Sequence, residues 1–289
     1  MRHSPAPDCP TGGILAGDGE LIQAYETGRG KLQVRAKVRI VPGNAGRSLI
    51  VMDEMPYQVN KAALLEKILR LSEEKKAIFS GIYDIRDESD RTGMRAVVEV
   101  KKDADPEKLL NALYKYSDMQ VTFGVNMVAI ADGKPVQMGI RRMLEYYIGH
   151  QKNVVTRRTK YELAQAEARA HILEGLIIAV DNLDEVIRLI RSSKTPKEAK
   201  VKLVERFALT DIQAQAILDM RLQRLTNLEV LSLKKEYEEL CKKIANFKAI
   251  LGSEKKLMAV IKKEMGEVRE KFANPRRTQI VPSFEAIVI

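Results

Sequence analysis

Five basic residues in the first quarter of the chain have the side chains and the spacing to bind a polyanion. From Gly28 to Ile40, apolar residues hold one parity and polar, mostly basic, residues hold the other. Side chains of a β-strand alternate between two faces, so the pattern predicts a strand with one buried and one cationic face. Such a face would bind phosphates without reading a base sequence. The candidate DNA-binding residues are Arg29, Lys31, Arg35, Lys37 and Arg39 of this strand, and Lys61 outside it.

The charge of these residues has no counterpart nearby in the sequence. No Asp or Glu occurs between Thr27 and Met52, which predicts a strand face without carboxylate partners. A solvated sheet face is the alternative, but protein surfaces normally intersperse both signs of charge. The whole chain of 289 residues has a net charge of +10, which favours nucleic acid as the partner over an anionic membrane surface.

Other kinds of chemistry are poorly supported by the sequence. Four carboxylates alternate with Arg86 and Arg91, so we expect an ion-pair network there and no metal site; they are Asp84, Asp87, Glu88 and Asp90. The three histidines are isolated, and no nucleophile with a neighbouring base can be identified. Two distant cysteines and the lack of a long apolar run predict a cytoplasmic protein without a membrane segment.

The elements that would carry the basic residues form an α+β domain. Strands are predicted at 48–55, around Ile82, at 94–100 and in a hairpin over 121–138. Asn60 is placed to cap one helix, and Pro106 lies in the first turn of another. Hairpins that alternate with helices predict a mainly antiparallel sheet with helices on one side.

The second half of the chain is predicted to be helical. A long helix covers 141–174, and apolar residues at heptad spacing continue from Leu233 to Phe272, with a restart at Ser253. Between them, Thr195 and Thr210 each begin a capping-box pattern. The apolar stripes are too thin to support lone helices of this length, so the two should pair antiparallel with the insert at their tip. The predicted divisions are 1–140, 141–174 with 231–272, 175–230, and 273–289.

The helical insert also offers a surface for association. A helix predicted from Asp211 to Arg224 carries more apolar side chains than so small a unit can easily bury. An apolar patch of this kind is an association site, and we expect a two-fold homodimer. The alternative is that the same residues form the core of the insert. The residues concerned are Ile212, Ala216, Ile217, Met220 and Leu225.

Seven strings in a fixed order resemble one known family. The chain is similar over essentially its whole length to the A subunits of bacterial type IIA topoisomerases, with DNA gyrase the nearer match and topoisomerase IV the next. The strings are YETGRGK at 25–31, EMPYQVNK at 54–61, DIRDESDR at 84–91, QVTFGVNM at 120–127, ARAHILEG at 168–175, QAQAILDMRLQRLT at 213–226 and RRT at 276–278.

This resemblance implies a structure and a function. It implies an antiparallel-sheet tower domain that flanks bound double-stranded DNA, then coiled-coil arms, and an all-helical exit-gate dimerisation domain at their tip. The DNA-cleaving tyrosine would lie upstream of the PDCPTGG string at 7–13, so no catalytic residue is expected here, and this chain alone should be inactive. ATP and most of the Mg²⁺ site are expected on the gyrase B subunit of an A2B2 complex. A non-catalytic DNA-bridging coiled-coil protein remains the alternative from another class.

Overall fold

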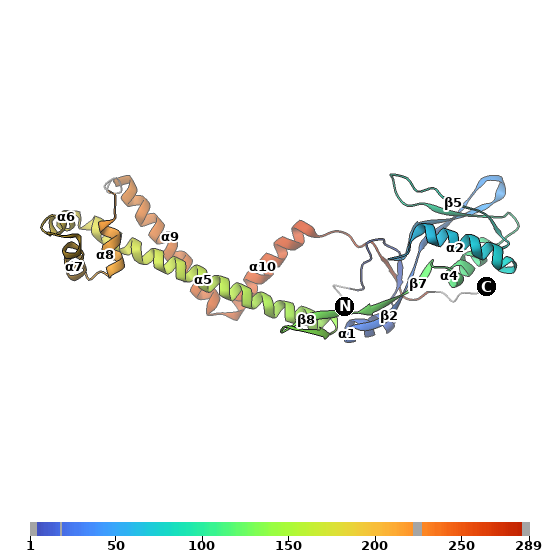
Figure 1. The fold of residues 1–289 in the computed structure, drawn as a ribbon, viewed down its shortest axis with the longest axis horizontal. Helices are drawn as coiled ribbons and strands as arrows, with labels where there is room; N and C mark the ends of the chain where they lie inside the picture. The colour runs from blue at the N-terminus through green and yellow to red at the C-terminus, as the bar shows by residue number, and fades with distance from the viewer. Residues whose placement is uncertain (1–4, 18, 222–226, 285–289) are drawn as a thin grey trace. The chain divides into compact units, whose positions relative to one another are not determined.

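The computed structural model describes residues 5–17, 19–221 and 227–284. The chain divides into two compact units. The first unit contains the residues up to Tyr146 together with those from Asn274 onward, and the second contains Tyr147–Ala273. The first is the α+β part and the second is helical, as the sequence predicts (Figure 1).

One of the two larger sheets of the first unit joins both ends of the chain. Its strand order is β10-β1-β2-β7, in which β10 is parallel to β1 and the other neighbours are antiparallel. A helix that the sequence analysis did not identify, α1, packs on it and shares its core. The elements are β1 (Ile14–Ala16), α1 (Gly19–Thr27), β2 (Arg29–Arg35), β7 (Gln120–Asn126) and β10 (Gln279–Val281).

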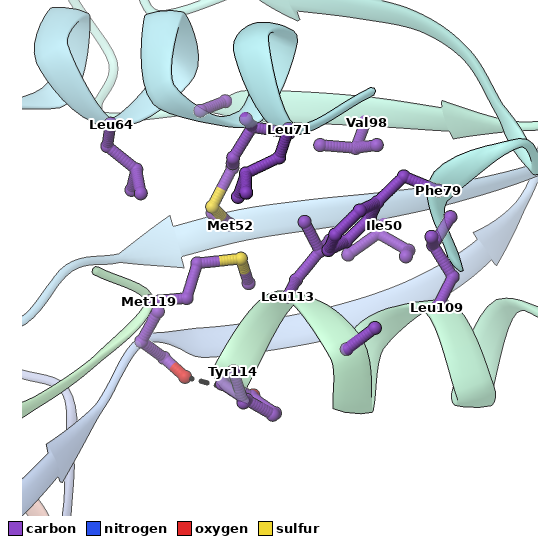
Figure 2. Close-up of a cluster of buried hydrophobic side chains, with 14 of the residues drawn as sticks. Ile50, Met52, Leu64, Leu71, Phe79, Val98, Leu109, Leu113, Tyr114 and Met119 are labelled. Carbon is purple, nitrogen blue, oxygen red and sulfur yellow. Dashed lines mark hydrogen bonds between the residues drawn. The ribbon is translucent and has the colours of Figure 1, made fainter. Parts of the chain in front are cut away.

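The second larger sheet is antiparallel throughout, with strand order β3-β4-β6-β5. Side chains from this sheet and from the helices α2 and α4 meet in one cluster, in which Ile50, Leu64 and Leu113 are fully buried (Figure 2). The elements are β3 (Lys37–Pro42), β4 (Ser48–Glu54), α2 (Lys61–Glu74), α3 (Lys76–Phe79), β5 (Ile82–Asp87), β6 (Ala96–Val100) and α4 (Pro106–Tyr116), with a short 3-10 turn, η1 (Asn44–Gly46).

Local capping signals in this unit are confirmed. The side chain of Asn60 accepts a hydrogen bond from the backbone of Ala63 at the start of α2, and Asp105 caps α4 with Pro106 in its first turn. The predicted hairpin over 121–138 is partly wrong, because β7 pairs with β2 instead. The hairpin itself consists of β8 (Val128–Ala131) and β9 (Lys134–Gln137).

The helical unit is built on α5 (Ile140–Asp181), which continues seven residues past its predicted end. Ser253 caps the last helix through the amide of Lys256, which confirms the predicted restart. Thr210 and Gln213 form a complete capping box, whereas Thr195 accepts from Glu198 without the reciprocal bond to its own amide. The remaining helices are α6 (Leu183–Arg191), α7 (Pro196–Phe207), α8 (Asp211–Leu218), α9 (Asn227–Leu251) and α10 (Glu254–Phe272).

Ion pairs between α5 and α9 show the relative direction of these two helices. From the start of α9 to its end, the pairs are Lys234 with Asp181, Glu236 with Arg169, and Lys248 with Glu167. The α5 numbers fall as the α9 numbers rise, so these two helices run antiparallel. The insert's core is shared with both, since Leu173 of α5, Leu203 of α7 and Leu233 of α9 lie in one buried cluster. None of the described helices is both long and apolar enough to cross a membrane.

Candidate functional site

The predicted cationic strand is two strands that belong to different sheets. β2 ends at Arg35, β3 begins at Lys37, and Ala36 between them is fully buried. Both backbone groups of Ala36 are used outside the ladders: its N–H donates to the Met119 carbonyl at 2.7 Å, and its carbonyl accepts from the Tyr114 hydroxyl at 3.3 Å. The prediction of one continuous strand is therefore wrong. The alternation of apolar and polar residues did not reveal this break, because Ala36 is apolar like the other residues of its parity.

Two of the predicted cations are neutralised by the neighbouring strand. Lys37 Nζ lies 3.2 Å from Glu54 Oε1, and Arg39 Nε lies 2.7 Å from Asp53 Oδ2. The register of the β3–β4 hairpin places Glu54 opposite Lys37. The hydrogen bond that Arg39 donates to Asp53 raises the pKa of Arg39. The prediction of a strand face without carboxylate partners is therefore wrong for Lys37 and Arg39. The missed signal was the pair Asp53-Glu54 at the end of the predicted strand 48–55.

Two further candidates are also engaged within the protein. Arg35 donates to the Gln120 side chain and has its guanidinium carbon 4.7 Å from the centre of the Tyr114 ring. Lys61 forms an ion pair with Asp87 at 2.6 Å. The hydrogen bond from Lys61 is the main reason why the pKa of Asp87 is lowered to about 2.

Arg29 and Lys31 differ from the other four candidates. Neither has an ion pair with any carboxylate in the described ranges 5–17, 19–221 and 227–284. Both line a hollow of about 730 Å³ between β2, β7 and α1. Two glycines and five other residues also line it: Gly30, Gly124, Gln23, Val125, Asn126, Gln137 and Glu20. The Glu20 residue has an interaction of its own. We call this hollow the basic groove.

Glycines give the basic groove its shape. An added Cβ at Gly30 would lie 2.7 Å from the Cβ of Ala24, so only glycine lets α1 pack this closely on β2. Gly124 lies opposite Lys31 in the β2–β7 ladder, and nothing lies within 4 Å of where its Cβ would be. Lys31 therefore stands beside open space, which a phosphate could enter to form charge-assisted hydrogen bonds.

Next to the sheet that carries this groove, two sequence segments from opposite ends of the chain, 7–13 and 276–278, are joined by hydrogen bonds. The Asp8 carboxylate accepts from the backbone amides of Thr278 at 2.8 Å and Arg277 at 3.1 Å, and the first of these bonds is the largest cause of its lowered pKa. The Cys9 amide donates to the Thr278 hydroxyl at 2.7 Å. Thr278 is only 1% exposed. The sequence contained both strings, but nothing in it indicated that they touch.

The predicted dimer residues are divided by the structure. Ile212 is 63% exposed, Ala216 and Met220 are half-buried, and Ile217 lies in the core of the insert at 4% exposure. Ile217 is therefore a core residue of the insert, which was the alternative to a place in the dimer interface. The helix α8 ends at Leu218 and not at Arg224, because Asp219 is its C-cap. Leu225 lies outside the described residues.

The acidic string at 84–91 forms only part of the predicted ion-pair network: Arg86 takes part, but Arg91 is in none of the ion pairs among the described residues, and Asp87 pairs with Lys61. Arg86 contacts Asp84, Glu88 and Glu99, and the second arginine on Glu88 is Arg95. Glu99, which the sequence analysis missed, is almost buried and also binds Arg47 at 2.9 Å. Among the described residues, no three His, Cys, Asp or Glu side chains are grouped so that they could hold a metal ion.

Comparison with known proteins gives a consistent result. Residues 1–266 match a family model that describes the A subunit of DNA gyrase/topoisomerase IV. The chain is 50% identical over 280 residues to the DNA gyrase A subunit of Clostridium acetobutylicum, covering 97% of this chain and 34% of that protein. It is 51% identical over 283 residues to the DNA gyrase A subunit of Halalkalibacterium halodurans, covering 98% and 34%. It is also 47% identical over 289 residues to the DNA topoisomerase 4 A subunit of Staphylococcus epidermidis, covering 100% and 36%. The chain thus spans about a third of the length of these relatives.

Proposed function

Since this chain belongs to the family of DNA gyrase and topoisomerase IV A subunits, we propose that it is the DNA-gripping and gate-forming part of such a protein. The reaction would be ATP-dependent passage of one DNA duplex through another in the cytoplasm, with supercoiling if the protein is a gyrase. Topoisomerase IV is the alternative, since both names occur among the relatives. The family match favours either enzyme over a non-catalytic DNA-bridging protein.

The same membership supports a division of labour between the parts of the protein. The first unit would hold double-stranded DNA, and the second would form the exit gate of a homodimer. ATP and most of the Mg²⁺ site would belong to the B subunit of an A2B2 complex. Cleavage is not expected from these 289 residues alone, because the family resemblance gives the role of the cleaving tyrosine to none of them.

The basic groove is the observation that carries the DNA-binding part of this proposal. Arg29 and Lys31 form none of the ion pairs among the described residues and share one hollow, whereas Lys37, Arg39 and Lys61 have carboxylate partners and Arg35 binds Gln120. A cation that already has a carboxylate partner must give up that partner before it gains much from a phosphate. Arg29 and Lys31 carry no such cost.

We expect Arg29→Gln with Lys31→Gln to reduce the steepness with which duplex-DNA affinity falls with salt. Each phosphate contact contributes about 0.9 to the slope of log affinity against log salt, so the slope should fall by nearly two. The matched control is Lys37→Gln with Arg39→Gln, which removes the same charge from paired residues and should change the slope by less than about one. Fluorescence anisotropy with one duplex over a salt series measures both. Equal changes for the two double variants would rule out the groove as the main contact.

The gate part of the proposal rests on Ile212, a large apolar side chain that is mostly exposed on α8. The chain should sediment as a two-fold dimer at tens of micromolar, and Ile212→Glu should weaken this dimer about tenfold or more, because the charge would have to be desolvated at the contact. Val268→Glu, on α10 and also exposed, is the control that should leave it unchanged. A strictly monomeric wild-type chain in analytical ultracentrifugation would contradict the gate assignment.

A further inference from the structure

Two of the family-like strings meet in the helical unit, where 168–175 of α5 contacts the start of α8. The meeting point is Gln213, a polar side chain that is only 4% exposed. Its Oε1 accepts from the Thr210 amide at 2.9 Å, and its Nε2 donates to the His171 carbonyl at 2.8 Å. A buried amide is costly unless it is satisfied, and this one is satisfied from two different helices.

Gly175 makes this approach possible. An added Cβ at Gly175 would lie 2.7 Å from Gln213 Cβ and 2.8 Å from Gln213 Cγ. Glycine is a poor helix former, so its presence inside α5 needs a reason, and the close approach of Gln213 supplies one. The carbonyl that Gln213 reaches belongs to His171, four residues earlier, which is the helical partner of the Gly175 amide.

The imidazole of His171 extends the contact to the helix cap. Its Nε2 lies 2.7 Å from the Thr210 hydroxyl oxygen, and the same oxygen accepts from the backbone N–H of Gln213 at 3.3 Å. Thr210 is the N-cap of α8. The first turn of α8 is therefore tied to one turn of α5 by directional bonds from both members of its capping box.

We propose that His171, Gly175, Thr210 and Gln213 form a polar latch that sets the orientation of α8 on α5. Apolar packing alone permits small shifts and rotations, whereas several hydrogen bonds of fixed direction specify one arrangement. The residue next to Gln213 is Ile212, the exposed side chain assigned above to the gate. The latch itself rests on these contacts, and its effect on dimer affinity rests on the proposed function.

The central variant is Gln213→Met, which keeps the length of the side chain and removes its polar atoms. The control is Gln215→Met on the same helix, where the glutamine is exposed and its Nε2 donates to the Asp219 carboxylate. Hydrogen exchange of the α8 amides should become about tenfold faster in Gln213→Met and stay within about twofold in the control, because only Gln213→Met removes the two hydrogen bonds that join α8 to its cap and to α5. The dimer should weaken in the same variant only.

A second pair of variants keeps the test decisive if Gln213→Met does not fold. His171→Ala alters a partly exposed residue and should also release α8, while His150→Ala, on an exposed face of α5, should not. Combining His171→Ala with Gln213→Met should add little to the faster single variant, because the two residues share one set of bonds. Gly175→Ala should speed exchange in α8, and Gly149→Ala, beside open space in α5, should not.

Two results would overturn the latch. One is exchange in α8 that is the same in Gln213→Met as in Gln215→Met. The other is acceleration by an equal factor in α6 and α7, which would make Gln213 an ordinary core residue. A monomeric wild-type protein would refute the proposed gate, but the exchange measurements would still decide whether the latch exists.

Discussion

Replacing Gly139 by alanine is expected to destabilise the first unit by about 3 kcal/mol, near the upper end of the usual cost of overpacking. An added Cβ at this position would lie 2.2 Å from the carbonyl oxygen of Glu26 and 2.4 Å from that of Tyr25. Both obstacles are backbone atoms at the end of α1, so no side chain can rotate away to make room. Gly28 approaches the same junction from the other side, with its missing Cβ 2.4 Å from the Met138 carbonyl oxygen.

The matched control for this substitution is Gly124→Ala. Gly124 belongs to the same unit, but nothing lies within 4 Å of its missing Cβ. The chain has no tryptophan, and circular dichroism would be dominated by the helical unit, so the effect is best followed by hydrogen exchange of the β2 and β7 amides. Equal protection in Gly139→Ala and Gly124→Ala would show that the junction is not close-packed.

Glu99→Gln is expected to cost about 2 to 3 kcal/mol, because it removes the charge that two arginines share at a nearly buried position. Glu99 is 7% exposed, accepts from Arg47 and Arg86, and lies on the second strand from the edge of its sheet. Glu88→Gln is the control, since Glu88 also joins two arginines but is far more exposed. Its loss should cost less than about 1 kcal/mol. Hydrogen exchange of the β6 amides distinguishes the two, and similar effects would contradict the importance of burial.

The same carboxylate gives the stability of the first unit a dependence on pH. The hydrogen bond from Arg86, and then that from Arg47, holds the pKa of Glu99 below its ordinary value of 4.5. A carboxyl with a lowered pKa stabilises the folded state fully above its unfolded pKa and loses this contribution as the pH falls through the folded value. The wild-type unit should therefore weaken in acid below about pH 4.5, and Glu99→Gln should reduce that dependence.

Local features were predicted well because they depend on residues a few positions apart. The caps at Asn60, Ser253 and Thr210 each consist of a side chain and an amide within one turn, so the sequence contains the whole interaction. The alternation around Leu32 and Val34 correctly marked the buried face of β2, because burial on one side of a sheet has a period of two.

The errors concern partners that lie far away in the sequence or are chosen by tertiary packing. A pattern of cations could not show that Lys37 and Arg39 meet carboxylates on the returning strand, whereas Arg29 and Lys31 form none of the ion pairs among the described residues. Likewise, helical spacing put Ile212 and Ile217 in one apolar set, although one is exposed and the other belongs to the core. Periodicity identifies a face but not what covers it.

The parallel pairing of β10 with β1 has a consequence for how the protein is made. Asp8 and its partner Thr278 are separated by 270 residues, and the whole helical unit is synthesised between them. On the ribosome, the helices of α5 to α10 can therefore form while β1 is still an unpaired strand edge, the kind of surface at which nascent chains misassociate. The sheet that bears the basic groove gains its last strand only when Gln279–Val281 has emerged, long after Arg29 and Lys31 have been translated.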